Sequence, residues 1–439
     1  MTATVREVLE FVRENDVKFI RLAFCDLLGC PKNISIMPEE LPEAFEHGIS
    51  FDAHAINGFT DITKSDLFLV PDPTTLSVLP WRPQQGRVVR FYCNIKNPDG
   101  SPFWGDTRAI LQKILKRVGE MGYTCMAGAE CEFYLFKTDE NGDPTTVPFD
   151  HAGYLDMAPL DKGENVRREI CLCLEEMGIR PETSHHEQGP GQNEIDFRFS
   201  DGLICADNLV TFKQVVKSIA ARNGLFASFA PKPLPGRSGS GLHINLSLVR
   251  NGLNLFGSGE RRDMDEAGSF IAGILQKIRE MTAFLNPLPN SYERLGAFEA
   301  PKYVSWSEGN RSQLVRIPAA RGDKVRMELR SPDPAANPYL AFALVIGAGI
   351  YGIENRLPLP ESVNVDLYNA DEHVTASLER LPENLEEALT IAEKSQFVRD
   401  ILGIEAAERY IRLKRQELTE YCRAADKREH FLEHYFKVI

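Results

Sequence analysis

Four segments of the chain carry polar side chains at every second position, and any fold must accommodate that alternation. Successive residues of a β-strand point to opposite faces, so each segment is typical of a strand with one polar and one apolar face. The apolar faces need cover, which helices between the strands can supply. The segments are AECEFYLF (129–136), QNEIDFRF (192–199), GLHINLSL (241–248) and KVRMELR (324–330).

The polar faces of these strands are mostly acidic and also carry arginine and histidine, unlike a simple solvated face. Clustered carboxylates repel one another and resist leaving water, so they become favourable around a divalent cation. Oxygen ligands select hard cations, here Mg²⁺ or Mn²⁺. The set is too large for one ion, so the sequence predicts at least two ions. The candidate ligands on these faces are Glu130, Glu132, Glu194, His243 and Glu328.

SHHEQGPGQNEIDF (184–197) adds one more acid, Glu187, just before the second of these strands. The turn formed by residues 189–191, Gly-Pro-Gly, can fold Glu187 back toward Glu194. His185 and His186 are neighbours on a strand and therefore point apart. We interpret them as supporting residues and not as a metal-binding pair.

Arginine is concentrated between residues 292 and 340, next to the acidic strands. Its planar fork suits carboxylates and phosphates, so the combination favours an anionic, phosphorylated substrate held by metals and arginine together. Glu299, in AFEAP, is expected on a loop as a movable acid over the site. The arginines are Arg294, Arg311, Arg316, Arg321, Arg326 and Arg330.

Composition narrows the class of protein. The 439 residues carry a net charge of -13 with no long basic run, which disfavours nucleic acid or an anionic membrane as partner. The nine cysteines are scattered, as in proteins that keep their thiols reduced. The longest apolar run, residues 340–353, is shorter than the roughly 20 residues that span a bilayer, and the N-terminus lacks an apolar signal core. These features predict a cytoplasmic protein.

The chain divides, by these patterns, into two domains. Residues 1–100 are predicted to form a small, mostly β domain, with strands in 17–36 and 87–95. Residues 101–439 are predicted to form a larger domain in which strands and helices alternate. Helices are predicted at 105–122, 163–178, 207–224, 385–403 and 405–436.

Five motifs together resemble those of the type I glutamine synthetase family, over nearly the whole chain. They are GAECEFYLF, SHHEQGPGQNEIDF, PKPLPGRSGSGLHINLSL, NRSQLVRIP and RMELRSPDPAANPYL. The resemblance implies an α+β fold with an N-terminal β-grasp domain and a C-terminal catalytic domain, in which helices surround a curved antiparallel sheet. It also implies a homo-oligomer, a dodecamer of two stacked hexameric rings with active sites between neighbouring subunits.

The activity implied by the resemblance is ATP-dependent ligation of ammonia to L-glutamate. The reaction passes through γ-glutamyl phosphate and yields L-glutamine, ADP and phosphate. By the same resemblance, one metal is held by Glu132, Glu187 and Glu194. The other is held by Glu130, His243 and Glu328. Nucleotide contacts are implied for Glu182, Asn245, Ser247 and Arg326.

The remaining implied roles concern glutamate, phosphate and ammonium. Glutamate contacts are implied for Gly239, Arg294 and Arg330. Arg311 and Arg316 are implied to contact the phosphates, and Glu299 is implied to close the site. Asp52, from a neighbouring subunit, helps to deprotonate ammonium, and Asp66 and Tyr154 help to form the ammonium pocket.

Two motifs depart from the family pattern and leave the nitrogen substrate open. FDAHA (51–55) stands where the family commonly has FDGSS, and SGSG (238–241) stands where it has NGSG. One alternative is therefore a γ-glutamyl-amine ligase that uses a polyamine or ethanolamine. Another is a non-catalytic nitrogen-sensing relative, against which the complete set of metal and arginine positions argues. Tyr368 lies where some members are adenylylated, but its surroundings favour an ordinary loop tyrosine.

Overall fold

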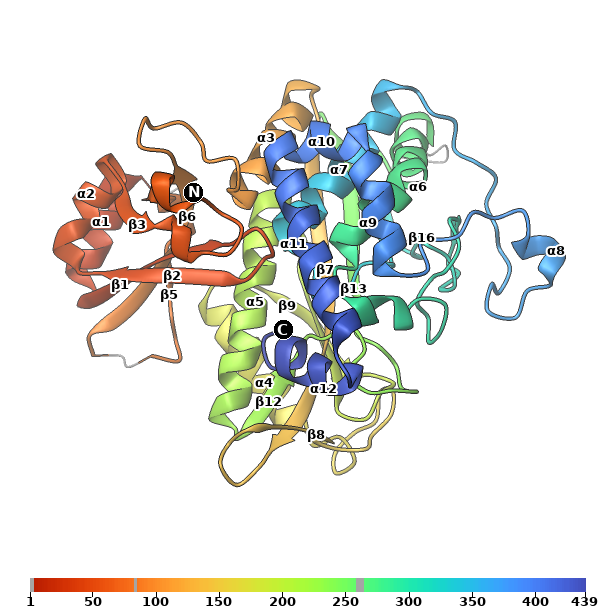
Figure 1. Cartoon of the computed structure of the whole chain (residues 1–439), viewed down its shortest axis with the longest axis horizontal. Coiled ribbons are helices and arrows are strands. Elements are labelled where there is room, and N and C mark those ends of the chain that lie inside the picture. Colours follow the sequence, from red (N-terminus) through yellow and green to blue (C-terminus); the bar gives the residue numbers. More distant parts are fainter. Residues whose placement is uncertain (1–3, 83–84, 258–263) are drawn as a thin grey trace.

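The computed structural model describes residues 4–82, 85–257 and 264–439, and it contains two separate sheets (Figure 1). The N-terminal sheet has the order β2-β1-β6-β4-β3, with β5 paired to β6. β1 and β6 run parallel, and the other pairs are antiparallel. The strands are β1 (Val17–Cys25), β2 (Pro31–Ile36), β3 (Ile49–Asp52), β4 (Asp66–Pro71), β5 (Ser77–Val78) and β6 (Arg87–Lys96).

Two short helices, α1 (Val5–Glu14) and α2 (Leu41–Glu46), belong to this N-terminal unit. Thr4 accepts a hydrogen bond from the backbone of Glu7, whose side chain bonds back to Thr4, so α1 begins with a capping box. α1 buries Val8 and Val12 in the common core and leaves its charged face in water.

The larger sheet has the order β15-β16-β17-β13-β7-β10-β9, with β8, β11 and β12 also paired to β7 and β14 paired to β13. Its pairs are antiparallel except β15 with β16. The α+β class with a curved sheet and surrounding helices is thus confirmed. The strands are β7 (Thr124–Thr138), β8 (Pro144–Pro148), β9 (Pro181–His186), β10 (Gln192–Phe197), β11 (Ser200–Asp201), β12 (Leu225–Ser228), β13 (Leu242–Arg250), β14 (Leu253–Asn254), β15 (Trp306–Glu308), β16 (Val315–Ile317) and β17 (Met327–Leu329).

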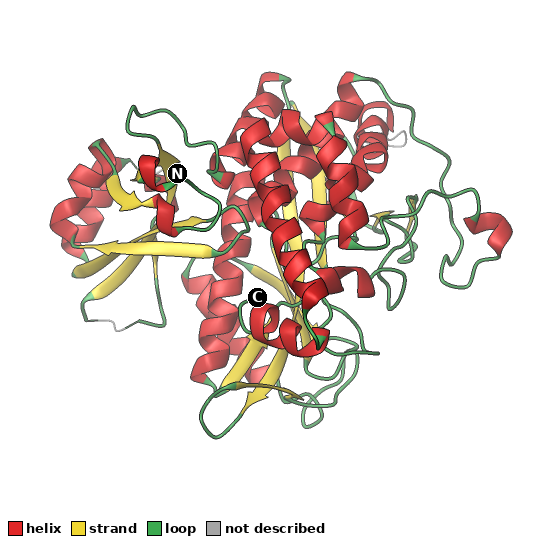
Figure 2. Ribbon diagram, in the orientation of Figure 1, coloured by secondary structure: helices red, strands yellow, loops and turns green. Residues whose placement is uncertain are grey.

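Helices cover the apolar face of this sheet, as Figure 2 shows in red. The apolar run predicted as a buried helix is α7, which is buried along nearly its whole length. α7 packs closely on α6, since a Cβ added to Gly273 or Gly352 would collide with the backbone of the other helix. The helices are α3 (Thr107–Glu120), α4 (Glu164–Glu176), α5 (Gly202–Arg222), α6 (Met264–Leu285), α7 (Pro338–Glu354), α8 (Glu372–Thr375), α9 (Leu385–Lys394), α10 (Gln396–Leu402), α11 (Ile404–Arg423) and α12 (Lys427–Phe431).

The two C-terminal segments predicted as helical are each interrupted. Ser395 has extended backbone angles and its hydroxyl accepts from the backbone of Val398, so it ends α9 and begins α10. Asp426 caps α12 in the same way after a break that follows α11. Local hydrogen bonds from short polar side chains therefore divide segments that periodicity alone shows as continuous.

The N-terminal and catalytic parts are joined by a buried ion network around Arg108 on α3. Its guanidinium lies 2.9 Å from Asp72, which follows β4, and 2.9 Å from Asp207 on α5. Tyr339 donates to Asp207 at 2.7 Å. A domain boundary at residue 100 stays a prediction, while this network shows how the two sheets are held together. No helix among the described residues is long and apolar enough to cross a membrane.

Candidate active site

The strand register brings the acidic side chains of β7, β10 and β13 together. Glu132 is the cross-strand partner of Glu194 on one side of β7. Glu130 is the partner of Asp196 on that side and of His243 on the other. Directly opposed residues have adjacent side chains on the same face. Five polar side chains are thereby fixed around the middle of one long strand.

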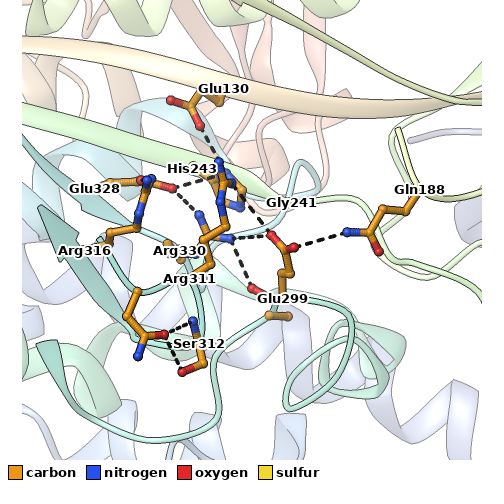
Figure 3. Close-up of polar contacts among 12 residues, drawn as sticks. Glu130, Gln188, Gly241, His243, Glu299, Arg311, Ser312, Arg316, Glu328 and Arg330 are labelled. Atoms are coloured by element: carbon orange, nitrogen blue, oxygen red, sulfur yellow. Dashed lines mark hydrogen bonds and ion pairs between the residues drawn. The ribbon is translucent and has the colours of Figure 1, made fainter. Parts of the chain in front are cut away.

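β16 and β17 extend this face with arginine. Glu328 on β17 pairs with Asn245 on β13 and with Arg316 on β16. The carboxylate of Glu328 is 1% exposed and accepts from Arg316 at 2.6 Å. Arg330 also donates to Glu328 (Figure 3). Two guanidinium groups thus compensate the charge of a carboxylate that water does not reach.

A cavity of about 640 Å³ opens on these side chains. A second cavity, of about 190 Å³, adjoins it and shares Glu130, Asp196 and Arg326 as wall residues. Sixteen of the predicted site residues line one or both cavities, and they are Glu130, Glu132, Tyr154, Glu182, Glu187, Glu194, Gly239, His243, Asn245, Ser247, Arg294, Glu299, Arg311, Arg316, Arg326 and Arg330. The structure therefore gathers residues that lie up to 200 positions apart in the sequence.

Three groups of side chains have the spacing needed to hold a metal ion. Glu130, His243 and Glu328 form the first group, which matches one predicted ligand set. Glu132, Glu194 and His243 form the second. The third contains His185, Glu187 and Glu194. Within each group the ligand atoms lie within 4.8 Å of one another, and the oxygen-rich donor set suits a hard cation.

The carboxyls of the site differ in their affinity for protons. Burial raises the pKa of Glu132 to about 7, and burial together with neighbouring acids raises the pKa of Glu194 well above its usual range. Burial also opposes the charge on Glu130, but a hydrogen bond from His243 and the positive charge of His243 outweigh it, and the pKa of Glu130 falls to about 2. Carboxyls whose negative charge is disfavoured in this way mark a place where added positive charge is favourable.

The two adjacent histidines point apart, as predicted, but one of them joins the site. His186 is fully buried and contacts Asp150 at 2.9 Å. His185 lies 2.9 Å from Glu187 and 3.8 Å from Glu194, inside the larger cavity. Tyr154 stacks edge-on against His185. His185 is thus in a position to bind a cation, while His186 only supports the strand.

Glycine is required where the chain passes beneath the acids. The backbone N–H of Gly241 donates to Glu132 at 2.9 Å. A Cβ added to Gly241 would lie 2.7 Å from Arg294 Nη2 and 2.9 Å from His243 Nε2. A Cβ on Gly239 would lie 2.9 Å from Cγ of Arg294. These contacts explain the glycines of the SGSG motif, because backbone must approach the charged groups closely.

Glu299 closes one side of the cavity on a strained loop. Phe298 and Glu299 both have positive φ angles, 50° and 66°, which side-chain-bearing residues rarely adopt. The carboxylate of Glu299 lies 3.7 Å from Arg311, 3.7 Å from Arg330 and 3.3 Å from the side-chain amide of Gln188 (Figure 3). The predicted movable acid therefore stands over the arginines.

Three predicted site residues do not line either cavity. Glu328 lies just behind the wall, bonded to Arg316 and Arg330. Asp52 and Asp66, in contrast, lie away from both cavities. They are cross-strand partners at the ends of β3 and β4, in the N-terminal sheet. Neither lines the catalytic cavities, in which Tyr154 lies. Within a single chain the expected ammonium pocket is therefore divided between two places.

Gln192 is a site residue that the sequence analysis missed. Its side-chain amide donates to Glu132 at 2.8 Å and to the carbonyl of Gly239 at 3.1 Å. It is fully buried, so it fixes the orientation of that carboxylate. The signal was available, because residues 192, 194 and 196 share one face of the same strand.

Comparison with known proteins places the chain in a family. Residues 16–98 match the family model for the glutamine synthetase β-grasp domain, and residues 104–432 match the model for the glutamine synthetase catalytic domain. The glutamine synthetase of Methanosarcina mazei is 49% identical over 423 residues, covering 95% of each chain. That of Clostridium saccharobutylicum is 46% identical, covering 95% of this chain and 96% of the relative.

Solved structures agree with these matches. A GmaS/ADP complex superposes with a TM-score of 0.87 at 32% identity, covering 99% of this chain and 100% of the other. The glutamine synthetase of Plasmodium falciparum gives 0.85 at 26% identity, covering 99% of both chains. With both family models matched in order along the chain and these strands forming the same fold, the protein belongs to the glutamine synthetase family.

Proposed function

We propose that the protein ligates ammonia to L-glutamate at the expense of ATP, forming L-glutamine, ADP and phosphate. The observation that carries this proposal is the shared cavity in which acidic groups suited to cations face the guanidinium groups of Arg311, Arg316 and Arg330. Cations and arginines around one cavity would suit a phosphoryl group moving onto a carboxylate. The relatives named glutamine synthetase favour ammonia over an organic amine.

The cation sites are proposed from the donor groups. Glu130, His243 and Glu328 would hold one ion. Glu132, Glu187 and Glu194 would hold another, and His185 lies against the last two acids. Bound Mg²⁺ or Mn²⁺ would neutralise phosphate oxygens during transfer. The Oδ1 of Asp196 is buried without a hydrogen-bond partner among the described residues, and burial raises the pKa of Glu132, so added positive charge is favourable here.

The smaller cavity is proposed to take the nucleotide. Glu182, Asn245, Ser247 and Arg326 line it, and it opens to the larger cavity beside Glu130. Arg326 donates to Asn245 at 2.8 Å, which orients its guanidinium across the opening. The related GmaS structure contains ADP, which supports a nucleotide in this fold.

Glutamate is proposed to bind beside Gly239, Arg294 and Arg330 at the other end. Arg294 is buried and donates to the carbonyls of Ser331 and Arg330 at 2.8 and 3.2 Å, so its position is fixed before substrate arrives. Arg330 is 1% exposed, and its Nε is buried without a hydrogen-bond partner among the described residues. A substrate carboxylate would satisfy a donor of this kind.

The order of steps follows from leaving-group chemistry. Ammonia cannot displace oxide from a carboxylate, so the γ-carboxylate first attacks the γ-phosphorus of ATP, and ADP leaves. Arg311 and Arg316 stabilise the charge that develops, and Glu299 closes the cavity against water. Asp52 then takes a proton from ammonium, and neutral ammonia displaces phosphate. The attacking nitrogen loses a second proton, which the departing phosphate can accept, to give the amide.

Asp52 and Asp66 can take part only if a neighbouring subunit supplies them, because their own chain keeps them away from the cavity. We therefore propose a homo-oligomer with active sites between subunits, a dodecamer of two hexameric rings, acting in the cytoplasm. Tyr154, 52% exposed at the cavity wall, would meet the incoming N-terminal sheet.

The deciding experiment measures phosphate release and product formation with ATP, glutamate and a panel of nitrogen donors. Ammonium should give glutamine with a far higher kcat/KM than ethanolamine or a polyamine. A higher kcat/KM for an organic amine would show that the amine, and not ammonia, is the nitrogen substrate. The ligase reaction would otherwise be the same. Absence of glutamate-dependent ADP formation with Mg²⁺ would instead indicate a non-catalytic relative.

A further inference from the structure

A cavity of about 290 Å³ lies apart from the catalytic cavities and shares no wall residue with them. Its walls come from the loop between β1 and β2, the middle of α5, the start of α7, α11 and the C-terminal residues. Figure 1 shows the C-terminus beside α5 and α12. The proposed reaction uses none of these groups.

Two lysines of α5 reach this cavity from successive turns of the helix. Lys213 and Lys217 are four residues apart and therefore share one face. Lys213 donates to the carbonyl of Pro334 at 2.7 Å, and Lys217 donates to the carbonyl of Val438 at 2.8 Å. Among the described residues, neither amine has a carboxylate within ion-pair distance, whereas Lys414 nearby is paired with Glu417 at 2.8 Å.

Burial disfavours the positive charge of both lysines, which lowers their pKa values. Burial lowers the pKa of Lys217 to about 8, and repulsion from Lys213 adds to the effect. Burial also lowers the pKa of Lys213. Buried charges are normally paired. Among the described residues these amines contact two carbonyls and, for Lys213, the ring of Phe229 at 5.5 Å, but no carboxylate, so they leave room for an anion.

The rest of the wall is largely apolar. Leu28, Val210, Leu288 and Pro338 contribute aliphatic surface to the same cavity. A ligand that fits must therefore combine one negative group with a hydrocarbon body, since a bare inorganic anion would leave the apolar wall uncovered. A nucleotide would place polar sugar and base edges against this surface.

We propose that this cavity binds a small organic carboxylate with an apolar body, whose carboxylate is held by Lys213 and Lys217. The bound acid would contact the N-terminal loop, α5 and the C-terminal residues at once. It therefore stabilises the docking of these three parts on one another. This site is independent of the proposed catalytic reaction and exists whichever nitrogen donor the enzyme uses.

The test uses the purified full-length oligomer, with hexanoate as probe and 1-hexanol as its uncharged counterpart. Calorimetry should give saturable hexanoate binding that excess glutamate does not displace, and hexanoate should raise the midpoint of thermal unfolding. Lys213→Met and Lys217→Met should each weaken binding about tenfold or more, the loss expected for one charged hydrogen bond. Lys217→Arg should retain binding, because it keeps the charge.

Lys116→Met on the exposed face of α3 is the matched control and should bind hexanoate like the wild type. Each variant is first checked for unchanged oligomeric state and basal unfolding midpoint. The proposal is wrong if hexanoate does not bind, if glutamate displaces it, if hexanol binds equally well, or if Lys116→Met weakens binding as much as Lys217→Met. If a neighbouring subunit fills the cavity in the oligomer, hexanoate will not bind, and the proposal is wrong.

Discussion

Individual residues of the active site are under opposing demands, and Glu328 illustrates them. Its carboxylate is almost fully buried, which alone would make its charge costly. Arg316 and Arg330 offset that cost, and the same two guanidinium groups face the cavity. The residues that stabilise the acid are thus those proposed to meet the substrate.

Substitution of Gly241 should separate catalysis from folding. In Gly241→Ala the added methyl would meet Arg294 and His243, so these side chains must shift. We expect a loss of kcat/KM of at least about 100-fold, since small displacements in an active site are costly, and a stability loss of about 1–3 kcal/mol. Steady-state kinetics and urea unfolding would measure the two effects.

Gly119→Ala provides the matched control, because Gly119 lies on the exposed side of α3 with open space around its Cα. That change should leave activity unaltered and raise the free energy of unfolding by about 0.5–1 kcal/mol. Wild-type kcat/KM in Gly241→Ala would show that the backbone does not pass so near the charged groups.

Removing bound cations should destabilise the protein, because the acidic side chains of the active site would then repel one another. Glu130, Glu132 and Glu194 repel one another when no cation lies between them. We expect chelation to lower the midpoint of thermal unfolding by several degrees, and Mg²⁺ or Mn²⁺ to restore it. In Glu194→Gln the dependence on the cation should be much weaker. An unfolding midpoint that changes with neither chelator nor added cation would argue against the proposed sites.

At the scale of elements, the alternation of polar residues predicted the strands β7, β10, β13 and β17 and the face that each turns to the site. The pairing of β7 with both β10 and β13 was not predictable from alternation, because register depends on contacts between distant segments. His185 was assigned a supporting role from strand geometry alone. Its contact with Glu187 is local, because the two residues are two positions apart, and the same alternation could have shown it.

The start of α3 allows the stabilising effect of a single capping side chain, Asp106, to be measured. Both carboxylate oxygens of Asp106 accept backbone hydrogen bonds, one from Ala109 in the first turn of α3 and one from Ile95 on β6. Asp106→Ala removes both and should cost about 2–3 kcal/mol of unfolding free energy. Asp106→Asn retains one acceptor and should cost about half as much. Equal stability of the two variants would show that the link to β6 contributes nothing.

For the whole molecule, Arg108 is expected to matter most for cohesion between the two sheets. Arg108→Ala leaves Asp72 and Asp207 buried without their cation, and should cost about 3–5 kcal/mol. Arg117→Ala, on the same helix but with a partly exposed partner in Glu354, should cost no more than about 1 kcal/mol. Chemical denaturation of both variants compares them. Similar losses would mean that the Arg108 network adds no more than a surface pair.

The proposed sharing of active sites between subunits predicts complementation. Asp52→Ala and Glu328→Ala should each be inactive, because one lacks the proposed proton acceptor and the other a proposed ligand. Co-expressed and assembled together, they should recover activity at roughly a quarter of the sites, since each intact site needs one subunit of each kind in the right order. Mixed oligomers that assemble and remain inactive would place Asp52 outside the reaction.

The resemblance of motifs predicted the family and the overall fold, which the comparisons confirm, because those motifs span nearly the whole chain. It did not predict the basic cavity beside the C-terminus, whose lysines stand out only once α5 is packed against the C-terminal residues. The positions of Asp52 and Asp66 show the complementary limit. Their distance from the cavity within one chain is the observation from which the shared site is proposed.

The position of β7 has a consequence for synthesis on the ribosome. β7 pairs along its length with several strands, yet it ends at Thr138, while β13 begins at Leu242. A nascent chain therefore carries an apolar, unpaired strand edge for about 100 further residues of translation, which is several seconds at ordinary elongation rates. Chaperone capture of the emerging polypeptide is expected over that interval, and slowing elongation after residue 138 would prolong exposure to misassembly.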